Sequence, residues 1–263
     1  MSIYRALAEL EARAGVGVLC TIVETHGSTP RNAGSKMLVY PDGSFVGTVG
    51  GGELERRAID EALAALKDGA PRKIAYSMND PAQGDPGLCG GQLEIFIEPI
   101  VPKAKLVVIG GGHVGKAVVH LAAWLGFHVI ISDDRPEFCT PQAVPDAQEY
   151  IVCPMSQLAE RTEINAWTSI VLTTRGADVD AAGLPVLLKQ AFAYIGVIGS
   201  RRRWVTTKKL LLEAGVDETQ IEIIKSPIGL ELNAETPEEI AVSILAQIIM
   251  LRRGGDGATM SAE

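Results

Sequence analysis

The hydrophobic and polar positions along the chain follow two different patterns, one before about residue 100 and one after it. In the first part, short apolar runs alternate with Gly-rich and Pro-rich stretches, which is typical of half-buried strands and their turns. Two segments of this part are helical in their periodicity. The pattern predicts helices over 2–13 and 50–69, and strands over 16–24, 36–40, 45–49, 72–78 and 93–100.

Beyond the two prolines of PIVPKA, residues 99–104, predicted strands and helices alternate regularly. The strands are continuous apolar runs, as expected for a parallel sheet that helices cover on both faces. We predict strands over 105–110, 127–133, 149–154, 168–175, 193–199 and 221–225, and helices over 112–125, 155–163, 179–190, 201–214 and 237–252. Thr236, Pro237 and Glu239 form the pattern of a capping box at the start of the last helix.

These elements predict an α/β protein of two domains. A small α+β domain occupies residues 1–100, and a Rossmann-like, doubly wound parallel sheet occupies residues 104–252. The Gly-rich tail over 253–263 has no apolar pattern to pack, so we expect it to be disordered.

Composition and charge exclude several classes of function. The net charge of -8 and the pI of about 5.1 give no field that would attract nucleic acid or an anionic membrane. The N-terminus has the pattern of an acidic amphipathic helix, and no apolar run approaches the roughly 20 residues that span a bilayer, which predicts a cytoplasmic protein. The four cysteines lack CxxC spacing, so no structural zinc site is predicted, and Cys20 and Cys153 lie in apolar strands as buried thiols.

A glycine fingerprint follows the first strand of the second domain. Gly110, Gly112 and Gly115 lie between a strand and a helix, the context in which GxGxxG binds a dinucleotide, and Asp133 follows about 20 residues later as a candidate ribose acceptor. His113 lies in the loop and either contacts a ligand or caps the helix. NAD(P) is one candidate ligand, and a Rossmann scaffold that binds another ligand, or none, is equally consistent with the motif. An ATPase phosphate loop is excluded because Ala117 stands where Ser or Thr would hold magnesium.

Two further loops should open on the same edge of the sheet, because the carboxyl ends of parallel strands lie together. One carries Arg175 after the strand that we expect beside the first. The other places Ser200 and Arg201–Arg203 at the start of a helix, where cations oppose the helix dipole unless an anion binds there. A solvated surface is the alternative interpretation of these arginines.

The first domain has its own candidate site, in the loop HGSTPRNAGSKM and the helix that starts on three glycines. Ser28, Arg31 and Lys36 offer hydroxyl and cationic groups, while Gly51 and Gly52 leave the backbone N–H groups of the helix start open, which together predict an anion cradle. Nearby carboxylates such as that of Glu53 would suit the N–H edge of a heterocycle. An ordinary loop beside an ordinary helix cap is the alternative.

Cys89 differs from the other cysteines because it lies in the Gly-rich loop GDPGLCGGQ. Exposure and backbone freedom there suit a thiol that handles sulfur or a soft metal.

Taken together, five stretches resemble the XdhC/CoxI family of xanthine dehydrogenase accessory proteins over about residues 4–252. These are GSTPRNAGSKMLVYPDGSFVGTVGGGELE, LCGGQLEIFIEP, IGGGHVGKAV with DDRPEF, YIGVIGSRRR, and SPIGLELNAETPEEIAVSILAQII. The family motifs fall on Gly27, Ser28, Pro30, Arg31, Gly34 and Met37; on Gly50, Gly51, Gly52 and Glu53; on Cys89, Gly90 and Gly91; and on Gly110, Gly112, His113, Gly115 and Asp133. The chain departs from the family pattern at Arg175, where a His is frequent, at Asn233, where a Gly is frequent, and near Gln247, where a Glu is frequent.

The resemblance implies a chaperone that is not itself a dehydrogenase. Such a protein would bind the molybdenum cofactor, as molybdopterin or its dinucleotide form, with Cys89 as the candidate metal contact. It would protect the cofactor while a cysteine desulfurase installs the terminal sulfur, and would insert it into a xanthine dehydrogenase-type molybdenum hydroxylase. The resemblance also implies a homodimer. The alternatives are an NAD(P)-dependent oxidoreductase, for which no partnered proton donor is apparent, and a non-catalytic Rossmann scaffold or regulator.

Overall fold

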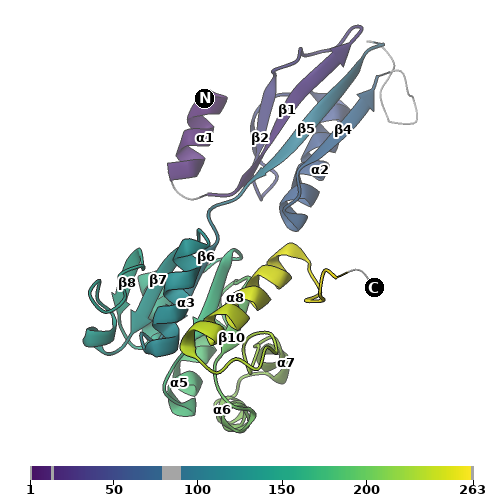
Figure 1. The fold of residues 1–263 in the computed structure, drawn as a ribbon. Coiled ribbons are helices and arrows are strands. Elements are labelled where there is room, and N and C mark those ends of the chain that lie inside the picture. The colour runs from purple at the N-terminus through teal and green to yellow at the C-terminus, as the bar shows by residue number, and fades with distance from the viewer. Residues whose placement is uncertain (1, 13–14, 79–89, 262–263) are drawn as a thin grey trace. The chain divides into compact units, whose positions relative to one another are not determined.

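The computed structural model describes residues 2–12, 15–78 and 90–261, which divide into two compact units, Met1–Pro102 and Lys103–Glu263 (Figure 1). Each unit has its own sheet and its own buried apolar clusters. None of the described helices is long and apolar enough to cross a membrane.

In its described residues, the N-terminal unit is an antiparallel sheet with two helices. Its elements are α1 (Ile3–Ala12), β1 (Gly17–His26), β2 (Lys36–Val39), β3 (Phe45–Gly47), α2 (Gly52–Asp68), β4 (Arg72–Ser77) and β5 (Gln92–Ile100). The strand order is β3-β2-β1-β5-β4, so β1 and β5, which begin and end the sheet in the sequence, are neighbours at its centre.

Small residues let α2 pack closely on one face of this sheet. Ala58, Ala62 and Ala65 recur at helical spacing and are fully buried against inward-facing strand residues such as Ile95 and Ile97. The opposite face is partly covered by α1, whose Leu10 packs in a second cluster. This arrangement leaves the turns that carry the sequence motifs at the ends of the strands.

The C-terminal unit is a parallel five-stranded sheet with helices on both faces, which confirms the Rossmann-like prediction. Its elements are β6 (Lys105–Ile109), α3 (His113–Trp124), β7 (His128–Asp133), η2 (Pro136–Phe138), β8 (Glu149–Val152), η3 (Met155–Gln157), α4 (Leu158–Arg161), β9 (Thr168–Leu172), α5 (Ala177–Leu187), β10 (Tyr194–Val197), α6 (Arg201–Glu213), α7 (Glu218–Glu222) and α8 (Pro237–Arg253). The strand order is β10-β9-β6-β7-β8, so β9 lies beside β6 as the sequence predicted.

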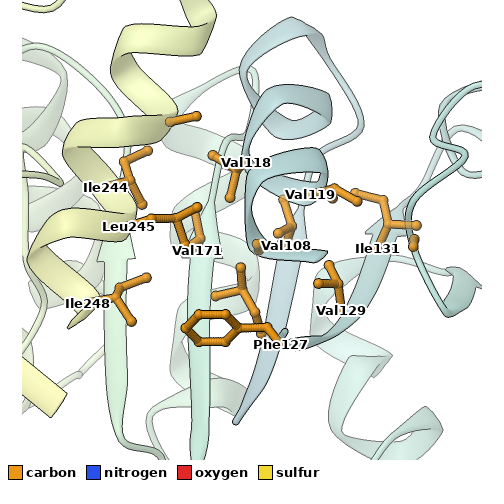
Figure 2. Close-up of a cluster of buried hydrophobic side chains, with 14 of the residues drawn as sticks. Val108, Val118, Val119, Phe127, Val129, Ile131, Val171, Ile244, Leu245 and Ile248 are labelled. Atoms are coloured by element: carbon orange, nitrogen blue, oxygen red, sulfur yellow. The ribbon is translucent and has the colours of Figure 1, made fainter. Parts of the chain in front are cut away.

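Two apolar clusters hold the helices to this sheet. Figure 2 shows the cluster beneath α3 and α8, in which Phe127 and side chains of the strands pack against the two helices. The helix residues labelled there are Val118 and Val119 of α3, and Ile244 and Ile248 of α8. The second cluster packs α4, α5, α6 and α7 on the other face. Fully burying an aliphatic side chain stabilises a fold by roughly 1.5–3 kcal/mol, so these clusters fix the strand ends firmly.

The prediction of a strand over 221–225 is wrong. Residues 218–222 form the short helix α7, and Lys225 makes only an isolated parallel bridge to Gly196. Ile221 and Ile224 are both buried, because a spacing of three places them on one face of a helical turn. Asp217 caps this helix by accepting a hydrogen bond from the backbone N–H of Thr219 at 2.8 Å. The predicted helix over 155–163 is shorter as well, with η3 followed by α4.

The start of α8 is formed as predicted. Thr236 and Glu239 make a complete capping box, with Pro237 in the first turn. Just before it, Asn233 has a φ of 52°, a left-handed conformation that Gly adopts without strain and that Asn tolerates better than most residues.

Candidate functional site

The glycine loop of the C-terminal unit lies between β6 and α3, beside the end of β9. A Cβ at Gly110 would lie 2.6 Å from the carbonyl oxygen of Thr173, and one at Gly115 would overlap the carbonyl oxygen of Gly110. A Cβ at Gly112 would meet nothing within 4 Å. Gly110 and Gly115 are therefore required for close packing, whereas Gly112 leaves space above the loop, which is where a phosphate approaches in folds of this type.

Asp133, the candidate ribose acceptor, has other partners in the structure. Its carboxylate accepts a hydrogen bond from the backbone N–H of Gly111 at 2.8 Å, and bonds from Arg135 Nε at 3.0 Å and Nη2 at 2.9 Å. The Asp133 side chain is 2% exposed. The predicted ribose contact is thus not supported by the geometry, because both carboxylate oxygens are already engaged inside the protein.

Arg175 does have a partner, which sequence analysis missed. Its guanidinium donates two hydrogen bonds to Asp134, from Nη1 at 2.7 Å and from Nη2 at 2.8 Å, so the pair is bidentate. These bonds lower the pKa of Asp134 from 3.8 to about 2. Asp134 follows β7 and Arg175 follows β9, the two strands that flank β6. The ion pair therefore links the loops on either side of the glycine loop.

A cavity of about 290 Å³ opens at this edge of the sheet. Gly110, Asp133, Asp134 and Arg175 all line it, so the structure brings together these parts of the predicted site. Its remaining wall is largely apolar and comes from the segment after β8 and from α5. The apolar residues of that wall are Cys153, Pro154, Met155, Val179, Ala182 and Gly183, and its polar residues are Ser156 and Asp178.

His113 lies elsewhere. It is exposed at the start of α3 and lines a second recess, of about 480 Å³, between α3 and α8. His120 lines the same recess and its Nδ1 lies 2.8 Å from Asp146. His113 is therefore absent from the lining of the cavity at the sheet edge, and its predicted ligand contact is not supported there.

The arginines at the start of α6 also differ in role. Ser200 is the N-cap of this helix, and Arg203 turns inward to Asp180, a fully buried carboxylate, at 2.7 Å. Arg203 also donates to the carbonyl and the hydroxyl oxygen of Thr174. The Asp180 carboxylate thus compensates the positive charge at the start of α6, and no external anion is needed for Arg203. Arg201 remains exposed. The sequence signal for this network was Asp180, a charged residue on the apolar helix α5.

In the N-terminal unit, three sequence motifs lie together. Ser28 forms an isolated bridge with Gly90, and a Cβ at Gly91 would overlap the carbonyl oxygen of Ser28. A Cβ at Gly50 would lie 2.8 Å from Pro30 Cγ. The loop after β1, the glycines before α2 and the glycines before β5 therefore meet at one end of the sheet, although they are far apart in the sequence.

The start of α2 is open on its outer side. Gly51 is the N-cap with a φ of 88°, no side chain caps it within the described residues, and a Cβ at Gly51 or Gly52 would meet nothing within 4 Å. Glu53 turns back to Arg56, whose Nε donates to it at 2.8 Å, and this bond lowers the pKa of Glu53. Its charge is therefore partly neutralised, which reduces its repulsion of an anion at the helix start.

Arg31 and Lys36 keep their charge available. Neither has a carboxylate within ion-pair distance in the described part of the chain. Cys89, the predicted metal contact, lies outside the described residues, and its role stays a prediction. Residues 2–12, 15–78 and 90–261 contain no cluster of three or more His, Cys, Asp or Glu side chains placed to hold a metal ion.

The other three cysteines are buried. Burial raises the pKa of the Cys20 thiol to about 12, so it is protonated and inert at neutral pH. Cys153 differs from the other two cysteines because it also lines the cavity at the sheet edge.

Known proteins match both units. Residues 106–248 match the family model of the XdhC Rossmann domain, and residues 11–77 match that of the XdhC and CoxI family. A crystal structure of a xanthine dehydrogenase from Bacillus halodurans has the same fold, with 98% of each chain covered, 24% identity and a TM-score of 0.52.

Three curated relatives are similar in sequence. The uncharacterized protein YqeB of Escherichia coli is 35% identical over 265 residues, which is 99% of this chain and 48% of YqeB. A probable xanthine dehydrogenase subunit from Bacillus subtilis is 35% identical over 159 residues, 60% of this chain and 46% of that protein. The chain thus spans about half the length of these two relatives. The molybdenum cofactor insertion chaperone PaoD of Escherichia coli is 23% identical over 285 residues, 89% of this chain and 83% of PaoD. With its Rossmann model matched over more than half of its length, the chain belongs to the XdhC/CoxI family.

Proposed function

We propose that this protein is a chaperone that binds the molybdenum cofactor as cargo and delivers it to a xanthine dehydrogenase-type molybdenum hydroxylase. Membership of the XdhC/CoxI family and the similarity to PaoD support the class of cargo. The observation that carries the proposal is the meeting of three family motifs at one end of the N-terminal sheet, around Ser28, Gly50 and Gly90.

The residues at this place fit a phosphate-bearing pterin. Space is free around Gly51 and Gly52, so an anion can approach the N–H groups at the start of α2. Arg31 and Lys36 lie on the loop and strand that lead to this place, and neither is neutralised by a carboxylate among the described residues. An acidic protein attracts no anions at long range, so cations without a carboxylate partner in this loop and strand are a specific local feature.

Each group would have a defined part in holding the cargo. Arg31 and Lys36 would oppose the charge of the phosphate, the α2 backbone would donate hydrogen bonds to its oxygens, and the Ser28 hydroxyl would donate to the pterin. When bound, the cofactor supplies the molybdenum centre on which a hydroxylase depends. Cys89 would contact the metal end, because a thiolate suits a soft metal.

Delivery requires that binding be reversible. Affinity divided among several modest contacts allows a high dissociation rate once a target enzyme competes for the cargo. A loop, a helix start and a pair of glycines provide such divided contacts better than one deep pocket. Sulfuration by a cysteine desulfurase and assembly as a homodimer belong to the same proposal.

Two observations argue against the alternative of an NAD(P)-dependent oxidoreductase. Both oxygens of Asp133 are engaged within the protein, so the usual ribose acceptor is occupied. The described residues that line the neighbouring cavity include no His, Lys or Tyr that would serve as a proton donor.

The proposal is tested by measuring the pterin that the protein carries. The chain is produced anaerobically in cells that make the cofactor, and the fluorescent pterin released by oxidation is quantified per mole of protein. Because a charge-assisted hydrogen bond contributes about 1.5–3 kcal/mol, the double variant Arg31→Gln/Lys36→Gln should carry at least about tenfold less pterin. Cys89→Ser should lower the molybdenum content more than the pterin content.

The matched control removes two charges from the same unit at a distance from the motifs. Arg5 and Lys67 are exposed on α1 and α2, so Arg5→Gln/Lys67→Gln should carry as much pterin as the unchanged protein. Absence of pterin from the unchanged protein, or equal loss in both double variants, would contradict the proposal.

A further inference from the structure

The cavity at the edge of the parallel sheet has features that the cargo site of the N-terminal unit does not use. Two ion pairs contribute to its lining, Asp133–Arg135 and Asp134–Arg175. The two pairs differ in how firmly their arginines are held, and this difference indicates which arginine is available to a ligand.

Arg135 is fixed. Its side chain donates from Nε and Nη2 to Asp133, its guanidinium carbon lies 3.9 Å from the centre of the Phe138 ring, and the carboxylate that it neutralises is 2% exposed. Removing the partner of a buried charge costs about 3–5 kcal/mol, so Arg135 cannot leave Asp133 without destabilising the unit.

Among the residues that the structure describes, Asp134 alone holds Arg175. The side chains are 48% and 37% exposed, and an ion pair at such a site contributes only about 0–1 kcal/mol. In this pair, the two Nη atoms of Arg175 donate to the two oxygens of one carboxylate. A phosphate group can accept the same two hydrogen bonds and carries more negative charge than a carboxylate. A phosphate can therefore replace the Asp134 carboxylate at little cost.

The position of the pair points to the same ligand. It joins the loops after β7 and β9 across the end of β6, where nucleotides bind in sheets of this strand order. The backbone N–H of Gly111 donates to Asp133, so the glycine loop has one hydrogen-bond donor fewer for a phosphate. A side chain is then needed to compensate the negative charge of the phosphate.

The rest of the cavity suits a base and a ribose. Apart from Asp178, its wall beside α5 is apolar, with Met155 packed against Gly183, and its volume of about 290 Å³ is close to the smallest ligand sites. Asp178, also in the lining, has no cation within ion-pair distance among the described residues, so its carboxylate is free to accept hydrogen bonds from ribose hydroxyls.

We propose that the C-terminal unit binds a nucleoside diphosphate in this cavity, and that Arg175 is the phosphate ligand, held by Asp134 until the nucleotide takes its place. The site goes beyond cofactor delivery and does not depend on it. Asp134 is then a competitor of the phosphate for the same guanidinium, and its removal should strengthen binding.

The two members of the pair therefore give opposite results in a binding experiment with the full-length protein. Titration calorimetry with ADP, CDP, GDP and UDP identifies the base that binds best. For that nucleotide, Asp134→Asn should tighten binding by about threefold or more, and Arg175→Gln should weaken it by about tenfold or more, as expected for a lost charge-assisted bond. The nucleoside without phosphate should bind equally to both variants, and inorganic pyrophosphate should compete with the nucleotide.

Charge-matched controls separate this effect from a general change of field. Asp146→Asn removes the carboxylate charge beside His120 at the other recess, and Arg161→Gln removes an exposed cation of α4, so neither should alter binding by more than about twofold. Absence of binding of all four nucleotides at millimolar concentration would overturn the proposal. Weakened binding in both Asp134→Asn and Arg175→Gln, with melting temperatures unchanged, would also overturn it, because the pair would then be a support of the site and not a competitor.

Discussion

At the scale of single residues, the carboxylate of Asp133 shows why a motif does not define a ligand contact. Its place at the end of β7 is the one expected for a ribose acceptor, and the strand ends there as predicted. The side chain nevertheless turns to Gly111 and Arg135. Which of two oxygens meets which donor depends on rotamers and loop geometry, so the residue could be predicted from the sequence but its partners could not.

The glycines of the same loop give a residue-scale prediction with a built-in comparison. Gly115→Ala would push a Cβ into the carbonyl oxygen of Gly110, and overpacking of this kind destabilises a protein by about 1–3 kcal/mol. Gly112→Ala places its Cβ in open space at a φ of -69°, which alanine adopts freely, so stability should change by less than about 0.5 kcal/mol. Urea unfolding followed by circular dichroism measures both.

Nucleotide binding is a second measurement for the variants Gly115→Ala and Gly112→Ala. The open space above Gly112 is where a phosphate would approach, so Gly112→Ala should weaken nucleotide binding although the unit remains stable. Equal stability of the two variants would show that the close contact of Gly110 and Gly115 is not needed for the fold.

At the scale of elements, periodicity predicted most of the C-terminal strands to within a few residues because they are continuous apolar runs that the sheet buries on both faces. It failed at IEIIK, where the same apolar residues fit a helical turn through Ile221 and Ile224. The capping Asp217 was the local signal that distinguishes the two structures. In the N-terminal unit, the contact of the loop at Ser28 with Gly90 is non-local, and no periodicity reports it.

The network of Arg203 connects α6 to α5 and to the loop after β9, and it gives the element-scale prediction. Arg203→Met would leave Asp180 buried and unpaired, which should destabilise the protein by about 3–5 kcal/mol. Arg202, its exposed neighbour on α6, is the matched control, and Arg202→Met should change stability by less than about 0.5 kcal/mol. Denaturant midpoints compared at constant m-value measure the difference.

A second substitution distinguishes loss of the ion pair from loss of packing. In Asp180→Leu/Arg203→Met neither charge of this pair remains, so much of the stability lost in Arg203→Met should return. A double variant as unstable as the single one would assign the effect to the packing of the arginine stem instead.

At the scale of the whole molecule, the two units have separate sheets and separate apolar clusters, and the two proposed ligand sites fall one in each. A domain with its own core can fold alone, so a fragment of residues 103–263 should unfold cooperatively. We expect its free energy of unfolding to lie within about 0.5 kcal/mol of the value for the same transition in the full chain. It should also bind the nucleoside diphosphate with unchanged affinity, since Gly110, Asp134 and Arg175 all belong to it.

The control fragment begins at residue 113 and lacks β6, the central strand of the order β10-β9-β6-β7-β8. Because β7 and β9 both pair with β6, its loss leaves two unpaired edges facing each other, and this fragment should not fold. A 103–263 fragment that is unfolded, or that loses nucleotide binding while folded, would mean that the N-terminal residues contribute to the C-terminal unit. Retention of both properties would instead mean that cofactor delivery and nucleotide binding can be varied separately, each by substitutions in its own unit.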